Sequence, residues 1–371
     1  MIVNNEFRNL VRLGDYIEVY DVKNVDSQDL PFFGINKDKT FMPTVADTNE
    51  LDNTKYKIVK KDVFVFSGMQ TGRDVCIRLA LYTNSKSILV SPAYTTFVVK
   101  DKSVILPEYL FIQFNRLQMD RYGWFLSDGS IRSNLDWSVF CELMIPLPEP
   151  EIQRELVDTY NGLKALAEQN EALIQPLTEA CQAYIVDCKN KYPEVELGGY
   201  IEEVDERNST NEITLTQGVD VNMQFIPAKR EAADKEGTKI VRTGQFAFNK
   251  VVKANGTKLP IALRNGPDCI ISSSYAVFQI SNAKLEPKFL RLWFSRSEVH
   301  RYCGFISQGT TRDVFSFEDL SNMKLSIPPI EVQQSIVNIY NCAEEANKIA
   351  TEAREKMKML CPALVQKAIN G

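Results

Sequence analysis

The sequence predicts an α/β protein built from a duplicated unit, in which two mixed α/β domains are separated by two long helices that pair as an antiparallel coiled coil. Residues 151–161 (EIQRELVDTYN) recur as residues 331–341 (EVQQSIVNIYN) at an offset of 180. Apolar residues then follow both copies at spacings of three and four, which is typical of a coiled-coil seam. The repeat also covers the segments before each helix, so we interpret it as a domain duplication with a pseudo-twofold arrangement.

A chain of 371 residues exceeds the size at which one hydrophobic core keeps growing, so more than one domain is expected. We predict a first domain, a central helix, a second domain and a distal helix, with the bounds 1–150, 151–192, 193–330 and 331–371. Each helix contains one proline, Pro176 or Pro362, and a proline lacks the N–H that a helix interior needs. A kink or a restart is therefore expected at both prolines.

The seam of the coiled coil is predicted from the apolar positions of the two helices. Spacings of three and four place such residues on one face of a helix. The predicted seam joins Leu156, Leu163, Leu173 and Leu177 of the first helix with Val332, Ile336, Met357 and Leu360 of the second. Small loop insertions account for the drift of the repeat offset from 184 near the start of each half to 180 at the helices.

Inside each half, matching segments predict matching elements. Alternating and β-branched residues predict strands. They occur in the pairs 57–66 with 239–248 and 90–99 with 271–280. Segments 106–114 and 286–294 are predicted as short helices, because Pro107 and Pro287 stand at their first turns, a position that proline favours.

The composition, 44% apolar and 25% charged, is that of an ordinary globular protein. The sequence shows no apolar run of membrane-spanning length, and its first residues lack the pattern of a signal peptide. Eight cysteines without C-x-x-C pairs favour reduced thiols in the cytoplasm. The net charge of −5 opposes nucleic-acid binding, but residues 226–264 hold nine basic and three acidic residues, while 194–206 hold six acids. Local patches of this kind steer a polyanion more than the total charge does.

Motifs for catalysis are missing from the sequence. Neither a G-x-x-x-x-G-K-[ST] phosphate loop nor a G-x-G-x-x-G motif is present. His300 is the single histidine and lies in a helical segment, where a structural role is the more common one. A Ser-His-Asp triad and a His-rich metal site are thereby nearly excluded. The sequence therefore favours a binding protein that is not an enzyme and holds no cofactor or metal of its own.

Four loops carry side chains suited to nucleic acid. Glycines permit close backbone approach, while Arg, Lys, Asn and Gln read base edges and hold phosphates. Loop 67–73 and its counterpart 249–258 follow strands, and loops 127–132 and 307–312 pair a Gly-Ser/Thr turn with an arginine. The candidates are Gln70, Arg73, Arg78, Ser130, Arg132, Lys250, Lys253, Asn255, Lys258, Thr310 and Arg312. A solvated turn is an equally good interpretation of loops 67–73 and 249–258 taken alone. Trp124 and Phe125 could stack on a base, although aromatic residues of this kind are more often part of the core.

Taken together, these features resemble the specificity subunit of type I restriction–modification systems. The resemblance rests on the S-P-A-Y-T-x-F strand at 91–97, the two G-S/T-x-R turns, the I-P-L-P exit at 145–148 and the Gln-rich long helix. It covers nearly the whole chain and departs at 272–275, where S-S-S-Y replaces S-P-A-Y and puts the local turn geometry in doubt.

The resemblance implies two target-recognition domains that each read one half of a bipartite double-stranded DNA site. It implies that the helices set the gap between the half-sites and dock two methyltransferase subunits, with restriction subunits completing the cleaving complex. S-adenosylmethionine, ATP and Mg²⁺ would belong to those partner subunits, and no membrane is involved. Two modules on a rigid rod would separate the half-sites by about one helical turn of DNA, ~34 Å, or somewhat more.

Three alternatives remain open from the sequence. The chain could be the specificity subunit of a system that methylates but does not cleave. It could instead be a scaffold whose two domains bind protein, although the basic loops in both halves argue against this. An enzyme with an unrecognised site is the third alternative, which the missing motifs disfavour. Salt-dependent DNA binding would separate the first alternative from the second.

Overall fold

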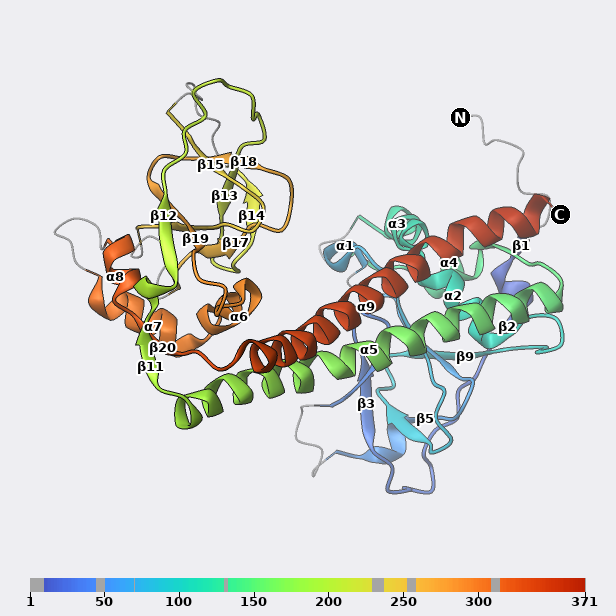
Figure 1. Ribbon diagram of the computed structural model, residues 1–371. Helices are drawn as coiled ribbons and strands as arrows, with labels where there is room; N and C mark the ends of the chain where they lie inside the picture. Colours follow the sequence, from blue (N-terminus) through green and yellow to red (C-terminus); the bar gives the residue numbers. More distant parts are fainter. Residues whose placement is uncertain are drawn as a thin grey trace. The chain divides into compact units, whose positions relative to one another are not determined.

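A computed structural model of the chain describes residues 10–44, 51–69, 71–129, 133–228, 237–251, 258–307 and 314–370 (Figure 1). The chain forms two compact units. Unit 1 comprises residues 1–169 and 349–371, and unit 2 comprises residues 170–348. Each unit contains one α/β globule together with a part of both long helices, so the two units are described separately.

Unit 1 contains two four-stranded sheets. The first is antiparallel, in the order β2 (Ile17–Val19), β9 (Thr95–Val99), β6 (Phe64–Ser67) and β7 (Arg78–Leu81). The second has the order β4 (Phe41–Pro43), β3 (Phe32–Ile35), β8 (Ile88–Val90) and β5 (Lys57–Val59), with β3 and β8 parallel. A short pair joins β1 (Leu10–Arg12) to β10 (Met144–Pro146).

Unit 2 repeats this plan. Its antiparallel sheet has the order β12 (Ile201–Val204), β19 (Tyr275–Ile280), β16 (Phe246–Asn249) and β17 (Ile261–Leu263). The place of the second sheet is taken by two strand pairs, β13 (Gln217–Val219) with β14 (Phe225–Pro227) and β15 (Lys239–Val241) with β18 (Cys269–Ile271). A short pair again joins β11 (Glu194–Glu196) to β20 (Lys324–Ser326). The predicted strands are confirmed in part. Segments 57–66 and 239–248, each predicted as one strand, span two strands separated by a turn, β5 with β6 and β15 with β16, and the two strands belong to different sheets. The strands predicted at 90–99 and 271–280 are found as β9 and β19.

Three helices recur in the same order in both units, and unit 1 also has a short helix between β6 and β7. Unit 1 has α1 (Thr71–Asp74), α2 (Pro107–Phe114), α3 (Leu117–Leu126) and α4 (Trp137–Cys141). Unit 2 has α6 (Pro287–Phe294), α7 (Ser297–Ile306) and α8 (Phe317–Ser321). The helices predicted at 106–114 and 286–294 are α2 and α6, each with its proline in the first turn as expected. Short 3₁₀ turns lie at Leu13–Asp15, Asn53–Lys55 and Leu197–Gly199.

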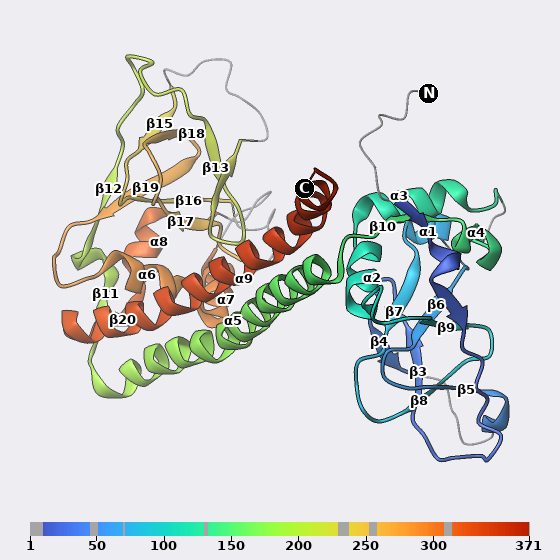
Figure 2. The same ribbon diagram turned by 90° about the vertical axis from the view of Figure 1, so that its right-hand side faces the viewer.

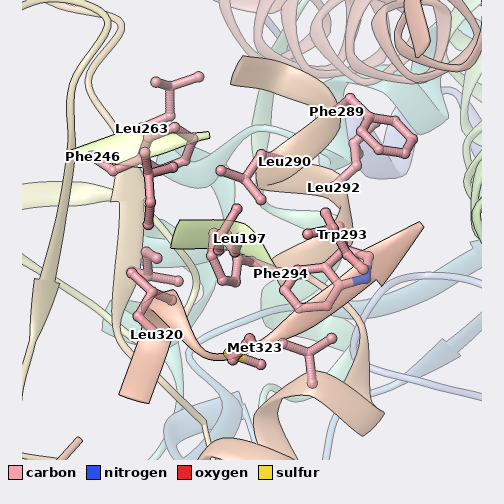
Figure 3. Packing of buried hydrophobic residues seen from close by; sticks show 14 of the residues in the cluster. Leu197, Phe246, Leu263, Phe289, Leu290, Leu292, Trp293, Phe294, Leu320 and Met323 are labelled. Carbon is pink, nitrogen blue, oxygen red and sulfur yellow. The ribbon is translucent and has the colours of Figure 1, made fainter. Parts of the chain in front are cut away.

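The cores of the two globules are built from equivalent aromatic pairs. Phe64 of β6 stacks on Phe97 of β9 with ring centroids 4.8 Å apart and planes at 6°, and Phe246 of β16 stacks on Phe278 of β19 at 4.9 Å and 5°. Both pairs sit directly opposite each other in the strand register. In unit 2, apolar side chains of α6 fill the space beside Phe246 (Figure 3). Cross-strand aromatic pairs of this kind stabilise a sheet beyond their area of burial.

The two long helices, α5 (Pro150–Lys191) and α9 (Ile330–Asn370), run antiparallel. In unit 2, the Cys181 thiol lies 3.6 Å from the Ile336 carbonyl oxygen. At the other end of this stretch, the Ser326 hydroxyl before α9 donates to the Tyr192 carbonyl oxygen after α5, at 3.1 Å. A higher residue number at the α5 side of a contact thus goes with a lower residue number at the α9 side, as in an antiparallel pair. Figures 1 and 2 show the two helices side by side, and the predicted pairing is confirmed.

The seam differs from the predicted one in its register on α5. Leu173 is 51% exposed, and Leu156 packs into the core of the unit 1 globule. After residue 160, buried or half-buried residues of α5 at spacings of three and four are instead Leu163, Ala167, Asn170, Ile174, Leu177, Cys181, Ile185 and Cys188. The seam position at Asn170 is polar, so a search for apolar residues alone does not find this register.

On α9 the seam is built largely from small side chains. Ala343, Ala346, Ala350 and Ala353 are all buried, and Ile336 and Met357 of the predicted seam are buried at its two ends. Alanines allow two helices to approach closely with few large side chains between them. The alanines of α9 can therefore pack against α5 without a leucine of α5 facing them, which agrees with the exposure of Leu173.

Neither proline restarts its helix. The helical assignment of α5 continues through Pro176, and that of α9 continues through residue 362. Pro176 and Ala172 are both exposed, so water can satisfy the Ala172 carbonyl that loses its intrahelical donor. Of the kink or restart expected at each proline, the restart is wrong, because both helices continue, and the kink stays a prediction.

Candidate nucleic-acid interface

In unit 1 the segments that flank the two candidate loops are bound to each other. The strand β6 ends at Ser67, and the carbonyl oxygen of Gly68 accepts a hydrogen bond from the Leu135 amide at 2.8 Å. A second link follows at Thr71, whose amide donates to the Ser133 carbonyl oxygen at 3.1 Å. A Cβ atom on Gly68 would overlap the Leu135 carbonyl, so this close approach requires glycine. The flanks of the loop after β6 and of the loop after α3 are therefore held together.

Unit 2 has the equivalent link in the equivalent place. The strand β16 ends at Asn249, and the carbonyl oxygen of Lys250 accepts a hydrogen bond from the Phe315 amide at 2.8 Å. Val251 and Val314 add an antiparallel bridge between the same two segments. The loop after β16 and the loop after α7 are thus bound together as well. The fold brings the flanks of all four candidate loops together in pairs, one pair in each unit.

In each unit a second hydrogen bond joins the last part of the loop after β6 or β16 to the helix α3 or α7. In unit 1 the Asp120 carboxylate on α3 accepts a hydrogen bond from the Ile77 amide at 2.9 Å. In unit 2 the imidazole Nδ1 of His300 on α7 accepts one from the Leu259 amide at 3.1 Å. The two acceptors occupy the same position of the repeat, so His300 has a structural role, as the sequence suggested.

His300 makes the unit 2 link sensitive to pH. Burial lowers the pKa of His300 from its ordinary value of 6.5, and the charge of Lys258 lowers it further. A protonated Nδ1 cannot accept a hydrogen bond. Because the folded-state pKa lies below the unfolded one, the link stabilises fully above pH 6.5 and is lost as the pH falls through the lowered pKa.

We therefore expect the Leu259 amide to lose protection from hydrogen exchange, relative to Ile77, as the pH falls below 6.5 and through the lowered pKa of His300. The Ile77 amide serves as the internal control because its acceptor is a carboxylate. In a His300→Asn variant the acceptor does not titrate, so the ratio of the two protection factors should no longer depend on pH. A ratio that is constant with pH in the native chain would contradict this role of His300.

The candidate residues fall on or between these linked segments. Arg73 belongs to α1, Arg78 begins β7, and Lys250 and Lys258 stand at the two described ends of the unit 2 loop. Lys250 is half-buried and Lys258 is exposed. Gln70, Ser130, Arg132, Lys253, Asn255, Thr310 and Arg312 lie outside the described residues.

Arg78 is already engaged within the chain. Its Nε donates to the Asp74 carboxylate at 2.9 Å, and a second guanidinium nitrogen pairs with the same carboxylate. The side chains of the pair are 22% and 11% exposed. A contact between Arg78 and DNA would therefore have to compete with this ion pair.

The basic stretch 226–264 is less available than its composition suggests. Lys239 is buried and pairs with Asp205 at 3.1 Å, and Arg242 binds both Glu206 and Asp268. Hydrogen bonds from Arg207 and then from Lys239 hold the pKa of Asp205 below its usual range, and the hydrogen bond from Arg242 does the same for Asp268. Arg264 is buried and stacks over Phe225 at 5.0 Å. Acids of the 194–206 stretch thus neutralise part of the basic stretch, which corrects the expectation of a free patch with a charge of +6.

The aromatic residues beside the loops also differ from expectation. Trp124 is 49% exposed and Phe125 is 78% exposed, so neither is a core residue. Tyr122 is 43% exposed, and its ring is nearly parallel to that of Phe125, with centroids 6.5 Å apart. Unit 2 has the matching exposed residues Tyr302 and Phe305.

Two glutamines that the sequence did not single out fix each long helix to its globule. Gln153 is fully buried; its side chain accepts from the Leu106 amide at 2.9 Å and donates to the carbonyl oxygens of Val104 and Pro148 at 2.8 Å each. Gln333 makes the same set of bonds in unit 2, with Glu286, Lys284 and Pro328 at 2.7–2.8 Å. The recurrence of this glutamine at offset 180 was the available signal.

The described part of the chain holds no cluster of three or more His, Cys, Asp or Glu residues that could bind a metal ion. Among the same residues, no helix has both the length and the apolar character needed to cross a membrane.

Comparisons with known proteins agree with this geometry. Residues 211–358 match the family model described as the type I restriction modification DNA specificity domain. The chain is 22% identical over 131 residues to the specificity subunit of the type I restriction enzyme HindI from Haemophilus influenzae; the match covers 35% of this chain and only 28% of that relative. A solved S subunit of a type I restriction–modification system from M. genitalium aligns with a TM-score of 0.62 and 12% identity, over 99% of this chain and 98% of that one. At this identity the likeness establishes the fold.

Proposed function

We propose that this chain, which carries a type I restriction–modification DNA specificity domain, is the sequence-reading subunit of a restriction–modification complex. Each unit reads one half of a bipartite duplex site. The target-recognition domains are residues 1–150 and 193–330, and residues 151–192 and 331–371 form the helices that set the gap between the half-sites. The chain itself is non-catalytic and works in the cytoplasm.

The observation that carries this proposal is the pairing of the candidate loops in both units. Each pair offers glycine-containing loops with basic and amide side chains at the end of a rigid sheet, as base-edge and phosphate contacts require. At an offset of 182, none of the seven residues of loop 67–73 is identical to its counterpart in 249–255. Two similar frames with different loop residues suit two different half-sites.

The proposed DNA contacts remain the residues predicted from the sequence. In unit 1 they are Gln70, Arg73, Arg78, Ser130 and Arg132. In unit 2 they are Lys250, Lys253, Asn255, Lys258, Thr310 and Arg312. Arg and Gln make bidentate contacts to guanine and adenine, and lysines hold phosphates.

The proposed partners are double-stranded DNA, two methyltransferase subunits and restriction subunits. S-adenosylmethionine, ATP and Mg²⁺ would be bound by those subunits. The partners would also supply part of the grip on DNA that a chain with a net charge of −5 lacks.

Lys258 tests DNA binding most directly, because it is exposed beside the unit 2 loop pair. We expect Lys258→Ala to weaken binding to every duplex alike and to reduce the slope of log K against log[salt] by about one. Lys284→Ala is the matched control. Lys284 is also exposed, but it lies after the C-terminal end of β19. The loop lies at the other end of this strand, where Tyr275 pairs with Asn249.

The measurement is DNA binding by the native complex and both variants over a range of salt concentrations. An unchanged slope in Lys258→Ala, or an equal loss in Lys284→Ala, would place this loop away from DNA. A native complex whose binding shows no salt dependence would instead support the protein-binding scaffold.

A further inference from the structure

The helices α3 and α7 show an unusual pattern of identity between the two units. They occupy the same place in the repeat and have the same length of ten residues. Only three of the ten positions are identical, and they hold Arg121 with Arg301, Tyr122 with Tyr302, and Phe125 with Phe305. All six side chains are exposed; the phenylalanines are 78% and 84% exposed and the tyrosines 43% and 46%.

The buried positions of the same helices have diverged. Met119 faces the core in unit 1 and Val299 in unit 2, Asp120 is replaced by His300, and Gly123 by Cys303. A duplicated helix kept only for folding would keep its packing residues and let exposed ones change, because exposed substitutions cost little stability. Here the exposed residues are the ones retained, so they serve a purpose other than folding.

A surface shared by both units must meet something that is the same at both. The DNA half-sites differ, and loop 67–73 accordingly shares no residue with its counterpart 249–255, whereas the loops after α3 and α7 share a serine, a glycine and an arginine. A phenyl ring has no group that binds a phosphate, so the common DNA backbone does not explain Phe125 and Phe305. Arginine with aromatic residues is instead the composition enriched at the energetic centre of protein–protein interfaces.

The charge of the face indicates what the partner must present. Of the neighbouring acids, Asp120 is bound by Lys39 at 2.7 Å and Glu298 pairs with Arg296. Within the part of the chain that the structure describes, these acids therefore form no ion pair with Arg121 or Arg301, which lie on an exposed aromatic face. The complementary surface has an apolar hollow beside a carboxylate.

We propose that the face formed by Arg121, Tyr122 and Phe125 in unit 1, and by Arg301, Tyr302 and Phe305 in unit 2, docks one methyltransferase subunit on each unit. This rests on the proposed function, in which two copies of the same subunit bind the chain. The ring of each phenylalanine enters an apolar hollow of the methyltransferase, and the arginine pairs with an acidic side chain beside it.

The test measures the affinity of the purified methyltransferase subunit for the full chain, by titration with native mass spectrometry to count the bound copies. We expect Phe125→Ala and Phe305→Ala each to weaken one of the two binding steps by roughly tenfold or more, and the double variant to weaken both. Trp124→Ala is the matched control, because Trp124 is exposed on the same helix but has Gly304 as its counterpart. It should leave both steps within about twofold.

Charge reversal gives a second, independent arm. Arg121→Glu with Arg301→Glu should weaken both binding steps, while thermal unfolding stays native because both residues are exposed. Unchanged affinity in both double variants overturns the proposal, as does a loss of DNA binding by the chain alone with methyltransferase affinity intact. A native chain that binds no methyltransferase would overturn the proposed function itself, which is a different result.

Discussion

Replacing Gln153 with leucine is expected to lower the free energy of unfolding of unit 1 by about 3 kcal/mol or more. The substitution leaves the Leu106 amide and the carbonyl oxygens of Val104 and Pro148 without their partner in a fully buried place. Each buried polar group that loses its hydrogen bond costs roughly 1–3 kcal/mol, and the apolar side chain recovers only part of that sum. Gln333→Leu should have the same effect on unit 2, because its bonds are the same.

Hydrogen exchange read separately over α2 and α6 is the right measurement, since two units need not unfold in one step. Gln153→Leu should accelerate exchange in α2 and leave α6 unchanged, and Gln333→Leu should do the reverse. Gln169→Leu is the control, because Gln169 lies on the same helix as Gln153 but is exposed; its effect should stay within about 0.5 kcal/mol. Equal exchange in native and Gln153→Leu chains would show that these bonds do not stabilise the unit.

The sequence predicted those parts of the fold that local chemistry determines. Alternating β-branched residues gave the strands around Phe64 and Phe246, and Pro107 and Pro287 gave the starts of α2 and α6. Duplication strengthened these predictions, because each signal occurred twice. The duplication also showed which loops of the two units correspond. In the structure, the loop after β6 is hydrogen-bonded to the loop after α3, and the loop after β16 to the loop after α7, through their flanking residues.

Features that depend on distant partners were not predictable in this way. The seam of α5 passes through Asn170, which an apolar pattern skips, and its partners on α9 are alanines with little hydrophobic signal. The charge of the 226–264 stretch was misjudged because Lys239 and Arg242 find acids that are 34 and 36 residues away in sequence. Composition counts charges, but only the fold decides which of them are neutralised.

The exposed aromatic residues are a second feature that the pattern of one helix could not predict. Tyr122 and Phe125 belong to a helix with buried positions at Met119 and Gly123, and the helix docks on its other face. An amphipathic pattern does not reveal which of two mixed faces turns inward. Comparing the two halves position by position does reveal it here, because identity is confined to the exposed face.

Gly68→Ala is expected to relax methylation in one half of the target and to spare the other. The new Cβ would overlap the Leu135 carbonyl, which belongs to the backbone, so the loop after β6 must separate from the loop after α3. The hydrogen bond from the Leu135 amide to the Gly68 carbonyl is then lost, and the unit 1 loop pair no longer holds its contacts in place. Losing a bidentate base contact costs ~1–3 kcal/mol of discrimination at that base pair.

The chain provides its own control for this experiment. Lys250 occupies the position of Gly68 in unit 2 and accepts the equivalent bond from Phe315 while carrying a side chain. Lys250→Ala therefore removes a charge without moving the loops and should weaken binding to all sequences alike. Arg73→Ala and Asn255→Ala extend the test, since each removes a proposed base contact from one unit without a backbone clash.

Methylated bases, sequenced in cells that express the chain with its methyltransferase partner, give the readout for all four variants. Gly68→Ala and Arg73→Ala should blur the same half-site, Asn255→Ala should blur the other, and the gap should keep its length because the helices are untouched. Hydrogen exchange over α2 is the check that unit 1 of Gly68→Ala remains folded. Blurring of both halves by any one variant, or a changed gap, would mean that a half-site is read by more than one unit. Two loop pairs that share their backbone hydrogen bonds, but whose loops 67–73 and 249–255 have no residue in common, should instead fail one at a time.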